Sequence, residues 1–476
     1  MSVIGNWSIP KQLEKSAYIP DLSSIPFLLI VFYLKKDFPS IHLLQEKSIM
    51  IISSKVTGVF VLIKCLVFFV ALLTNCLFAI PIDLGIDVFF QEGHYKQLKG
   101  KKIGLITNHT GVNKECVPTA QLIRDKDKEL HLVALFCPEH GFDGKAFAGQ
   151  KIEDSLDRCN IPIYSLHGDT RRPTAEMLRG IDVLIYDIQD IGVRPYTYAT
   201  TLFYVMEEAA KRKIQVIVMD RPNPINGIIV DGAMLEEKCR SFIGYINIPY
   251  CHGMTIGELA GLFNAEYKVG CNLKVIPMKG WDRSMRFSDT GLLWIPTSPN
   301  IPEPDTPLFC ASTGIIGELG IVNIGIGYTL PFKVVGAPWI NAEFFAEQLN
   351  AQNLSGVHFI PFHFSPFYGS LKGEECHGVL IKVTDSRTYR PLSVQYLLIG
   401  LLKSLYPNQV KEALEKVNQT KKQLFCKANG NEEIYRLLKD EQYIAWRMIS
   451  YGRKEREEFK KVREKYLFRS YAEIQK

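Results

Sequence analysis

Short runs of hydrophobic residues recur from about residue 84 onward, and polar or helix-like stretches separate them. A continuous apolar run of about four to eight residues is typical of a strand buried on both faces of a parallel sheet. Five runs of this kind occupy residues 102–107, 131–137, 161–165, 181–188 and 214–220. Helix-like stretches lie at about 115–127, 174–180 and 197–212. The alternation predicts βαβ units and a Rossmann-like, mostly parallel sheet over residues 80–240.

The regular alternation of strand-like and helix-like segments ends at about residue 240, and Pro and Gly become frequent between residues 291 and 338. Further strands are predicted at 274–278, 321–327 and 378–385, and further helices at 255–265, 341–351 and 393–405. A charged, helix-prone stretch follows at about 408–466 and is expected to pack on the same part of the chain. We therefore predict a second, smaller α/β domain at 241–476 that completes a cleft with the first.

Residues 50–79 have the pattern of an export signal. Lys55 supplies a positive start, an apolar run follows at 61–73, and Ala79 offers a small residue at a cleavage position. The sequence therefore predicts a signal peptide and an exported protein, periplasmic or extracellular, in a bacterium. The sequence L-T-N-C that ends at Cys76 only faintly resembles a lipoprotein cleavage box, because Asn is a poor residue before the cysteine.

The stretch 1–49 is unusual upstream of a signal peptide. A true start at Met50 would make it a non-native or unstructured extension, whereas the alternative is a genuine N-terminal membrane anchor. Its apolar run at 27–34 is shorter than the roughly 20 residues that span a bilayer. We therefore expect no stable membrane insertion once the signal has been cleaved.

Composition and charge narrow the function classes. The chain is 47% hydrophobic and 22% charged, which is typical of a globular protein. A net charge of +6 over 476 residues is too mild to indicate nucleic-acid binding. Its 11 cysteines include no C-x-x-C pair and no histidine spacing suited to zinc, so neither a disulfide framework nor a metal site is predicted.

Each predicted strand of the first domain ends in polar turn residues. The loops are 107–111, 137–142, 167–174, 187–194 and 220–227. If the strands are parallel, all five loops open on one edge of the sheet, and ligands bind beyond the carboxyl ends of such strands. Asn108, in the first loop, is accordingly among the candidate substrate-binding residues.

The run D-I-Q-D-I-G-V-R-P-Y at 187–196 is the most polar of these strand ends. It contains Asp187, Gln189, Asp190, Arg194 and Tyr196. We predict that these side chains bind the hydroxyl and acidic groups of a ligand. Arg194 is the expected carboxylate clamp, because its planar guanidinium can donate two hydrogen bonds at once.

Two glutamates are the candidates for acid–base chemistry. Glu139 and His140 follow the second predicted strand beside glycines, a setting that lets a ligand approach the backbone closely. Glu318 lies in the apolar stretch T-G-I-I-G-E-L-G-I, where desolvation should raise its pKa and suit it to donate a proton. We predict that the two glutamates face each other across the cleft.

His252 and Asn300 lie in loops of the second predicted domain and fit a substrate site and a structural role equally well. The chain has no P-loop, no G-x-G-x-x-G after the first strand, no G-x-S-x-G and no H-E-x-x-H. Nucleotide-dependent enzymes, α/β serine hydrolases and zincins are therefore disfavoured.

Five motifs occur in one order: C-P-E-H-G-F, D-I-Q-D-I-G-V-R-P-Y-T-Y, D-R-P-N-P-I-N-G, H-G-M-T-I-G-E-L and G-Y-T-L-P-F-K-V-V-G-A-P-W. With these motifs the chain resembles the NamZ-type exo-β-N-acetylmuramidases of bacterial peptidoglycan recycling, over roughly residues 84–470. The resemblance implies a Rossmann-like domain, a smaller α/β domain, and release of N-acetylmuramic acid from the non-reducing end of peptidoglycan-derived saccharides without a metal or organic cofactor.

The resemblance also implies a catalytic pair of glutamates. Glu139 matches the first and Glu318 is the best match for the second. From the residues themselves, we expect His140 and His252 to orient the two glutamates and Arg194 to bind the lactyl carboxylate. The chain departs from the family in having Cys137 where many relatives have Gly, and the apolar I-G-I-G-Y-T at 324–329 where many have a polar segment.

Two alternatives stay open at this point. The apolar 324–329 segment would also suit a muropeptide-binding envelope protein without catalysis. An amidase acting at the lactyl–peptide junction is disfavoured, because the sequence offers neither a metal set nor a nucleophile triad.

Overall fold

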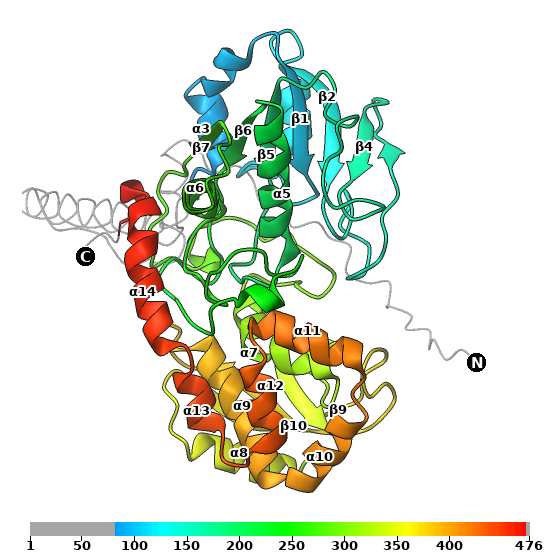
Figure 1. Ribbon diagram of the computed structural model, residues 1–476, viewed down its shortest axis with the longest axis vertical. Helices are drawn as coiled ribbons and strands as arrows, with labels where there is room; N and C mark the ends of the chain where they lie inside the picture. The colour runs from blue at the N-terminus through cyan, green and yellow to red at the C-terminus, as the bar shows by residue number, and fades with distance from the viewer. Residues whose placement is uncertain (1–80, 473–476) are drawn as a thin grey trace, which may run out of the picture. The chain divides into compact units, whose positions relative to one another are not determined.

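A computed structural model describes residues 81–472 of the chain (Figure 1). These residues belong to a single compact unit, Phe78–Lys476. The predicted extension 1–49 and the signal segment 50–79 lie outside the described residues. Between residues 81 and 472, no helix is both long and apolar enough to cross a membrane.

The first part of the described chain is built on a seven-stranded sheet of order β3-β4-β2-β1-β5-β6-β7 (Figure 1). Its strands are β1 (Lys102–Thr107), β2 (His131–Cys137), β3 (Ser155–Leu156), β4 (Pro162–Ser165), β5 (Val183–Asp187), β6 (Gln215–Met219) and β7 (Leu273–Ile276). All neighbouring strands are parallel except β3, which pairs antiparallel with β4 at one edge. The mostly parallel, Rossmann-like sheet predicted from the apolar runs is confirmed.

Alternate residues of the strands point to opposite faces of this sheet, and helices cover both faces. These helices are α3 (Gly85–Gln91), α4 (Thr119–Arg124), α5 (Thr197–Lys211) and α6 (Ile256–Glu266). Ile106 and Tyr186 pack in the core that includes α5 and α6, whereas Leu105 and Ile185 pack in the core that includes α3 and α4. Burial on both faces explains why the strands read as continuous apolar runs.

The H-G-M-T-I-G-E-L motif at 252–259 forms the beginning of α6. Thr255 and Glu258 form a reciprocal capping box, in which each side chain accepts a hydrogen bond from the other residue's backbone N–H. Asp220, at the end of β6, accepts hydrogen bonds from the Thr255 hydroxyl and the Gly257 N–H, both at 2.8 Å. The motif therefore fixes α6 against the sheet.

The second part of the chain has a three-stranded antiparallel sheet of order β8-β10-β9 (Figure 1). Its strands are β8 (Val334–Ala337), β9 (Val357–Phe364) and β10 (Cys376–Val383). Its helices are α7 (Thr306–Leu319), α8 (Ala342–Asn350), α9 (Pro391–Leu405), α10 (Pro407–Glu415), α11 (Gln419–Asn429), α12 (Glu433–Asp440) and α13 (Ala445–Ser450). A smaller second domain with its own sheet is thus confirmed.

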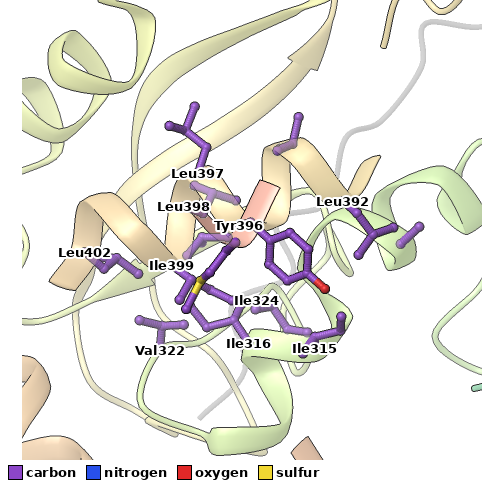
Figure 2. Packing of buried hydrophobic residues seen from close by; sticks show 14 of the residues in the cluster. Ile315, Ile316, Val322, Ile324, Leu392, Tyr396, Leu397, Leu398, Ile399 and Leu402 are labelled. Atoms are coloured by element: carbon purple, nitrogen blue, oxygen red, sulfur yellow. The ribbon is translucent and has the colours of Figure 1, made fainter. Parts of the chain in front are cut away.

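Helices α7 and α9 form the centre of the second core (Figure 2). Ile315 and Ile316 of α7 pack with Tyr396 and Ile399 of α9, and all four side chains are fully or almost fully buried. Ile191, from the loop after β5, belongs to the same cluster. The core of the second domain therefore extends to the edge of the large sheet where the predicted site lies.

Several predicted elements are corrected. The segments 255–265 and 274–278 were placed in the second domain, but they form α6 and β7, and β7 pairs with β6 in the large sheet. The predicted helix at 174–180 is a series of turns. The predicted strand at 321–327 is also a turn region, because Gly325 and Gly327 adopt positive φ angles of 83° and 87°.

The C-terminal segment does not stay on the second domain as predicted. Helices α10 to α13 do lie there, but α14 (Arg453–Arg463) returns to the first domain, where Phe459 joins its core. The Arg463 guanidinium donates to the Gly253 carbonyl at 2.6 Å, and the Tyr471 hydroxyl donates to Asp220 at 2.8 Å. The end of the chain therefore ties the two domains together.

Candidate active site

The strand order reverses its direction at β1, near the middle of the large sheet. The chain runs from β1 to β2 and β4 on one side, and then returns to β5 on the other side of β1. Such a reversal is where ligands bind in open α/β sheets, beyond the carboxyl ends of the strands. Because β1, β2, β4, β5 and β6 are parallel, the five polar loops open on this edge, as predicted.

Glu139 lies at this edge, two residues after β2, and is 8% exposed. One carboxylate oxygen accepts a hydrogen bond from the Gly149 N–H at 2.7 Å, and the other accepts from the Thr197 hydroxyl at 2.8 Å. The His167 Nε2 lies 3.7 Å from the first oxygen. A loop, a helix start and a neighbouring strand end therefore hold the carboxylate in one orientation.

His140 follows in a left-handed backbone conformation with a φ of 72°, which is uncommon for a residue other than glycine. Its Nδ1 lies 2.8 Å from the Ala146 carbonyl oxygen. A carbonyl can only accept, so Nδ1 carries a proton and donates this hydrogen bond. A strained backbone of this kind tends to occur at functional sites.

Several loops near Glu139 contain buried polar atoms without a hydrogen-bond partner. Among the described residues they include His109 Nδ1, His167 Nδ1, Asp190 Oδ1, the Tyr196 hydroxyl and the Thr297 hydroxyl. The Tyr196 hydroxyl faces Thr297 and Ser298 without a hydrogen bond of good geometry. Unpaired buried polar groups are costly and rare, so a cluster of them indicates a place where a polar ligand binds.

The loop that contains Thr297 comes from beyond the sheet and closes the crevice. The Tyr198 hydroxyl donates to the Thr297 carbonyl at 2.7 Å and accepts from the Asn108 amide at 3.1 Å. The His109 Nε2 donates to the Pro296 carbonyl at 2.6 Å. Asn108 therefore helps to position the loops of the site through Tyr198. All of its hydrogen bonds among the described residues are to other residues of these loops or to Tyr198.

Asp190 is the second carboxyl group in this cluster. It is 7% exposed, and one of its oxygens accepts from the Gly192 N–H at 2.8 Å while the other has no partner. Burial raises the pKa of Asp190 to about 7. A carboxyl group of this kind holds a proton near neutral pH and can donate it.

Asp187 and Gln189 belong to the scaffold. Asp187 is fully buried, and it accepts hydrogen bonds from Arg221 Nε at 2.6 Å and from the Thr119 hydroxyl. Gln189 donates from its amide to the carbonyls of Asp190 and Pro222, at 2.8 and 2.9 Å. Both were predicted to bind substrate, but the Asp187 carboxylate and the Gln189 side-chain NH2 already have partners inside the protein.

Arg194, the predicted carboxylate clamp, is buried among backbone carbonyls, and its Nε has no hydrogen-bond partner. It is 3% exposed, and its terminal nitrogens donate to the carbonyls of Ala233, Ile248 and Ala428 at 2.7 to 2.9 Å. Burial lowers the pKa of Arg194 to about 10. Because Ala428 belongs to α11, this side chain joins the two domains rather than facing a ligand.

His252 and Glu318 lie apart from the Glu139 cluster. His252 is 1% exposed and accepts from the Met254 N–H at 3.2 Å, and burial lowers its pKa to about 3. Glu318 lies in the last turn of α7. Burial raises its pKa to about 7, which confirms the predicted direction of the shift. Within residues 81–472, no hydrogen bond or ion pair joins Glu318 to Glu139.

Asn300 lies at the rim of the site, where its amide oxygen accepts from the Tyr368 hydroxyl at 3.3 Å. Sequence reasoning missed His167 and Thr197, which contact Glu139 directly. His167 lies in the polar stretch 167–174 that the sequence had identified as a loop of the site, whereas Thr197 is the first residue of a predicted helix and gave no such signal. No three His, Cys, Asp or Glu side chains between residues 81 and 472 converge as a metal-binding group.

Comparisons with known proteins identify the family of this chain. Family models for the N-terminal and C-terminal parts of exo-β-N-acetylmuramidase NamZ match residues 103–305 and 308–468. The chain is 39% identical over 387 residues to the peptidoglycan β-N-acetylmuramidase NamZ of Bacillus subtilis (strain 168), across 81% of this chain and 91% of that protein.

Two crystal structures of DUF1343 family proteins from Bacteroides fragilis are also similar. One has a TM-score of 0.76 and 39% identity, and the match covers 82% of this chain and 99% of that one. The other has a TM-score of 0.64 and 26% identity, with 83% and 100% covered. The fold and the site therefore define a glycoside hydrolase with a Rossmann-like first domain. The chain belongs to the NamZ family of exo-β-N-acetylmuramidases.

Proposed function

We propose that this enzyme releases N-acetylmuramic acid from the non-reducing end of peptidoglycan fragments. The observation that carries the proposal is the cluster of unpaired buried polar atoms around the Glu139 carboxylate, at the edge of the sheet where ligands bind. The family membership and the activity named for the Bacillus subtilis relative supply the substrate class.

The chemistry of glycoside hydrolysis calls for two carboxyl groups around an oxocarbenium-like transition state. We assign these roles to Glu139 and Asp190. Asp190, with a pKa of about 7, donates a proton to the glycosidic oxygen. Glu139 acts on the anomeric carbon, directly or through a water, and its two donors fix the carboxylate for that step.

The sheet geometry supports this pair over Glu139 and Glu318. Strand β1 lies between β2 and β5, and adjacent strands are about 4.8 Å apart. The strand ends that lead to Glu139 and Asp190 are therefore about 10 Å apart, with the end of β1 between them.

We assign the binding of the lactyl carboxylate to Arg171 instead of Arg194. Its side chain is exposed, and its guanidinium carbon lies 4.3 Å from the centre of the Phe242 ring. The same ring lies 5.7 Å from the His167 ring, which contacts Glu139. No carboxylate within residues 81–472 pairs with Arg171, so its charge is available to an acidic substrate.

Export is a further part of the proposal and rests on the sequence of residues 50–79. An exported muramidase would meet cell-wall fragments directly. Cell fractionation with N-terminal sequencing of the mature protein tests this. A start near residue 80 in the exported fraction supports export, and an unprocessed protein in the cytoplasm contradicts it.

The activity itself is tested with a defined saccharide of alternating N-acetylmuramic acid and N-acetylglucosamine. With N-acetylmuramic acid at the non-reducing end, we expect free N-acetylmuramic acid as the first product, identified by mass spectrometry. The matched control carries N-acetylglucosamine at that end and should not be cut. Release of internal fragments, or binding without cleavage after long incubation, would overturn the proposal.

A further inference from the structure

Three large aromatic side chains are exposed on two loops beside the site. Phe147 is 60% exposed, Phe367 is 69% exposed and Tyr368 is 46% exposed. Together with the partly buried Tyr328 we call them the aromatic rim. Exposed aromatic groups that gather in this way mark binding surfaces more often than isolated apolar residues do.

Contacts between the two domains hold the rim together. The rings of Phe147, from the first domain, and Tyr368, from the second, lie 6.4 Å apart at an interplanar angle of 65°. The Tyr328 and Phe367 rings stack at 6.3 Å with an angle of 29°. The rim is therefore one surface built from both domains.

The glycine-rich turn at 324–329 supports this surface. The Phe367 N–H donates to the Gly327 carbonyl at 2.6 Å, which fixes the two loops against each other. A Cβ on Gly327 would lie 2.0 Å from the Tyr368 carbonyl oxygen, so only glycine allows this approach. The apolar segment 324–329 thus carries Tyr328 and supports Tyr368.

The rim also adjoins the Glu139 cluster on both sides. Phe147 lies two residues before Gly149, whose N–H binds the Glu139 carboxylate at 2.7 Å. The Tyr368 hydroxyl donates to the Asn300 amide oxygen at 3.3 Å, and Asn300 follows the loop that contains Thr297. A saccharide that extends outward from Glu139 would therefore meet these rings.

We propose that the aromatic rim is a binding subsite for the N-acetylglucosamine ring of the leaving saccharide. Aromatic rings offer flat apolar faces to the C–H faces of a pyranose, while the Tyr368 hydroxyl and the Asn300 amide offer hydrogen bonds to its polar groups. The proposal rests on the muramidase function, since an exo-acting enzyme holds the terminal sugar inside and the rest of the saccharide outside.

The test compares two substrates that share N-acetylmuramic acid and differ in the leaving group. One is the disaccharide with N-acetylglucosamine, and the other is N-acetylmuramyl fluoride, which has no leaving sugar. In the Tyr368→Ala and Phe147→Ala variants we expect the ratio of kcat/KM for the disaccharide to that for the fluoride to fall about tenfold. The matched control is Tyr443→Ala, which removes an aromatic side chain that is 82% exposed between α12 and α13 and should leave the ratio as in the wild type.

An unaltered ratio in both rim variants would overturn the subsite. A second measurement separates this failure from failure of the proposed function. Binding of N-acetylglucosaminyl disaccharide, which contains no muramic acid, is followed by saturation-transfer NMR and needs no turnover. We expect the wild type to bind it and Tyr368→Ala to lose at least half of the signal; equal signals would contradict the subsite even in an enzyme that cleaves neither substrate.

Discussion

The loop after β2 and the loop after β5 both contain candidate site residues in the sequence, but they differ in how their polar groups are paired. After β5, Asp187 is bound to Arg221, and Arg194 donates to three backbone carbonyls. Around Glu139, by contrast, buried polar atoms lack partners. Because the Glu139 carboxylate is itself paired and the Arg194 Nε is not, the two loops differ in the set of unpaired polar atoms beside them rather than in the pairing of any one group.

Asp190 is the exception within the second loop. It is three residues from Asp187, yet one of its oxygens has no partner, and its pKa is raised to about 7. The D-I-Q-D-I-G-V-R segment therefore contains both kinds of residue: Asp187 supports the fold, and Asp190 belongs to the candidate site.

The largest effect is expected for Glu139→Gln. The change keeps the shape of the side chain but removes the carboxylate, so kcat for the muramyl disaccharide should fall by about 10³-fold or more. The melting temperature should stay close to that of the wild type, because Glu139 is held by only two hydrogen bonds. Turnover within tenfold of the wild type would remove Glu139 from the chemistry.

The Asp190→Asn variant tests whether Asp190 is the residue that donates the proton, as distinct from Glu139. Without the acid, kcat on the disaccharide should fall by about 10²-fold to 10³-fold. A dinitrophenyl N-acetylmuramide, whose leaving group needs no proton, should lose far less. Equal losses on both substrates, measured by steady-state kinetics, would contradict the assignment of Asp190 as the acid.

The Arg194→Met variant tests whether Arg194 stabilises the fold rather than binds substrate. Three buried carbonyls would lose their donors, so we expect the free energy of unfolding in urea to fall by about 3 kcal/mol. The control Arg179→Met changes an exposed arginine and should alter stability by less than about 0.5 kcal/mol. A stable variant with a raised KM for muramides would instead return Arg194 to the substrate site.

Arg171→Gln tests the assignment of the lactyl carboxylate. We expect the preference for a muramide over the matching glucosaminide, as a ratio of kcat/KM values, to fall about tenfold to a hundredfold. Arg179→Gln is the control for loss of a surface charge. The assignment fails if the ratio is the same in both variants.

The smallest effect concerns pH and stability. Folding raises the pKa of Asp190 above its unfolded value of 3.8, so the stability that its protonated form contributes is present below about pH 4 and is lost as the pH rises through about 7. The Asp190→Asn variant cannot ionise there. Its melting temperature relative to the wild type should therefore rise by about 2 °C or more between pH 5 and pH 8. A constant difference would contradict the raised pKa.

Much of the large sheet could be predicted, because its strands are buried on both faces and read as uninterrupted apolar runs. The predicted bounds of β1 and β2 agree with the structure at every residue. Helix α7 was missed, since Gly314, Gly317 and the β-branched Ile315 and Ile316 are poor helix formers. Packing of that segment against α9 outweighs the local preference.

Part of the candidate site, namely Glu139 and His140, could also be predicted from the sequence. Glu139 and His140 are visible in the sequence as polar residues beside glycines at a strand end. The role of Arg194 could not be predicted, because its partners are backbone carbonyls and leave no mark on the sequence. Arg171 was missed because only the fold brings Phe242 and His167 beside it.

A crystal structure of the Glu139→Gln variant with the muramyl disaccharide would test the central claim most directly. Our account predicts the N-acetylmuramic acid ring between residues 139 and 190, with its polar groups on the unpaired atoms of His167 and Tyr196 and its lactyl carboxylate at Arg171. A sugar bound at Arg194 or Glu318, away from those unpaired atoms, would contradict it.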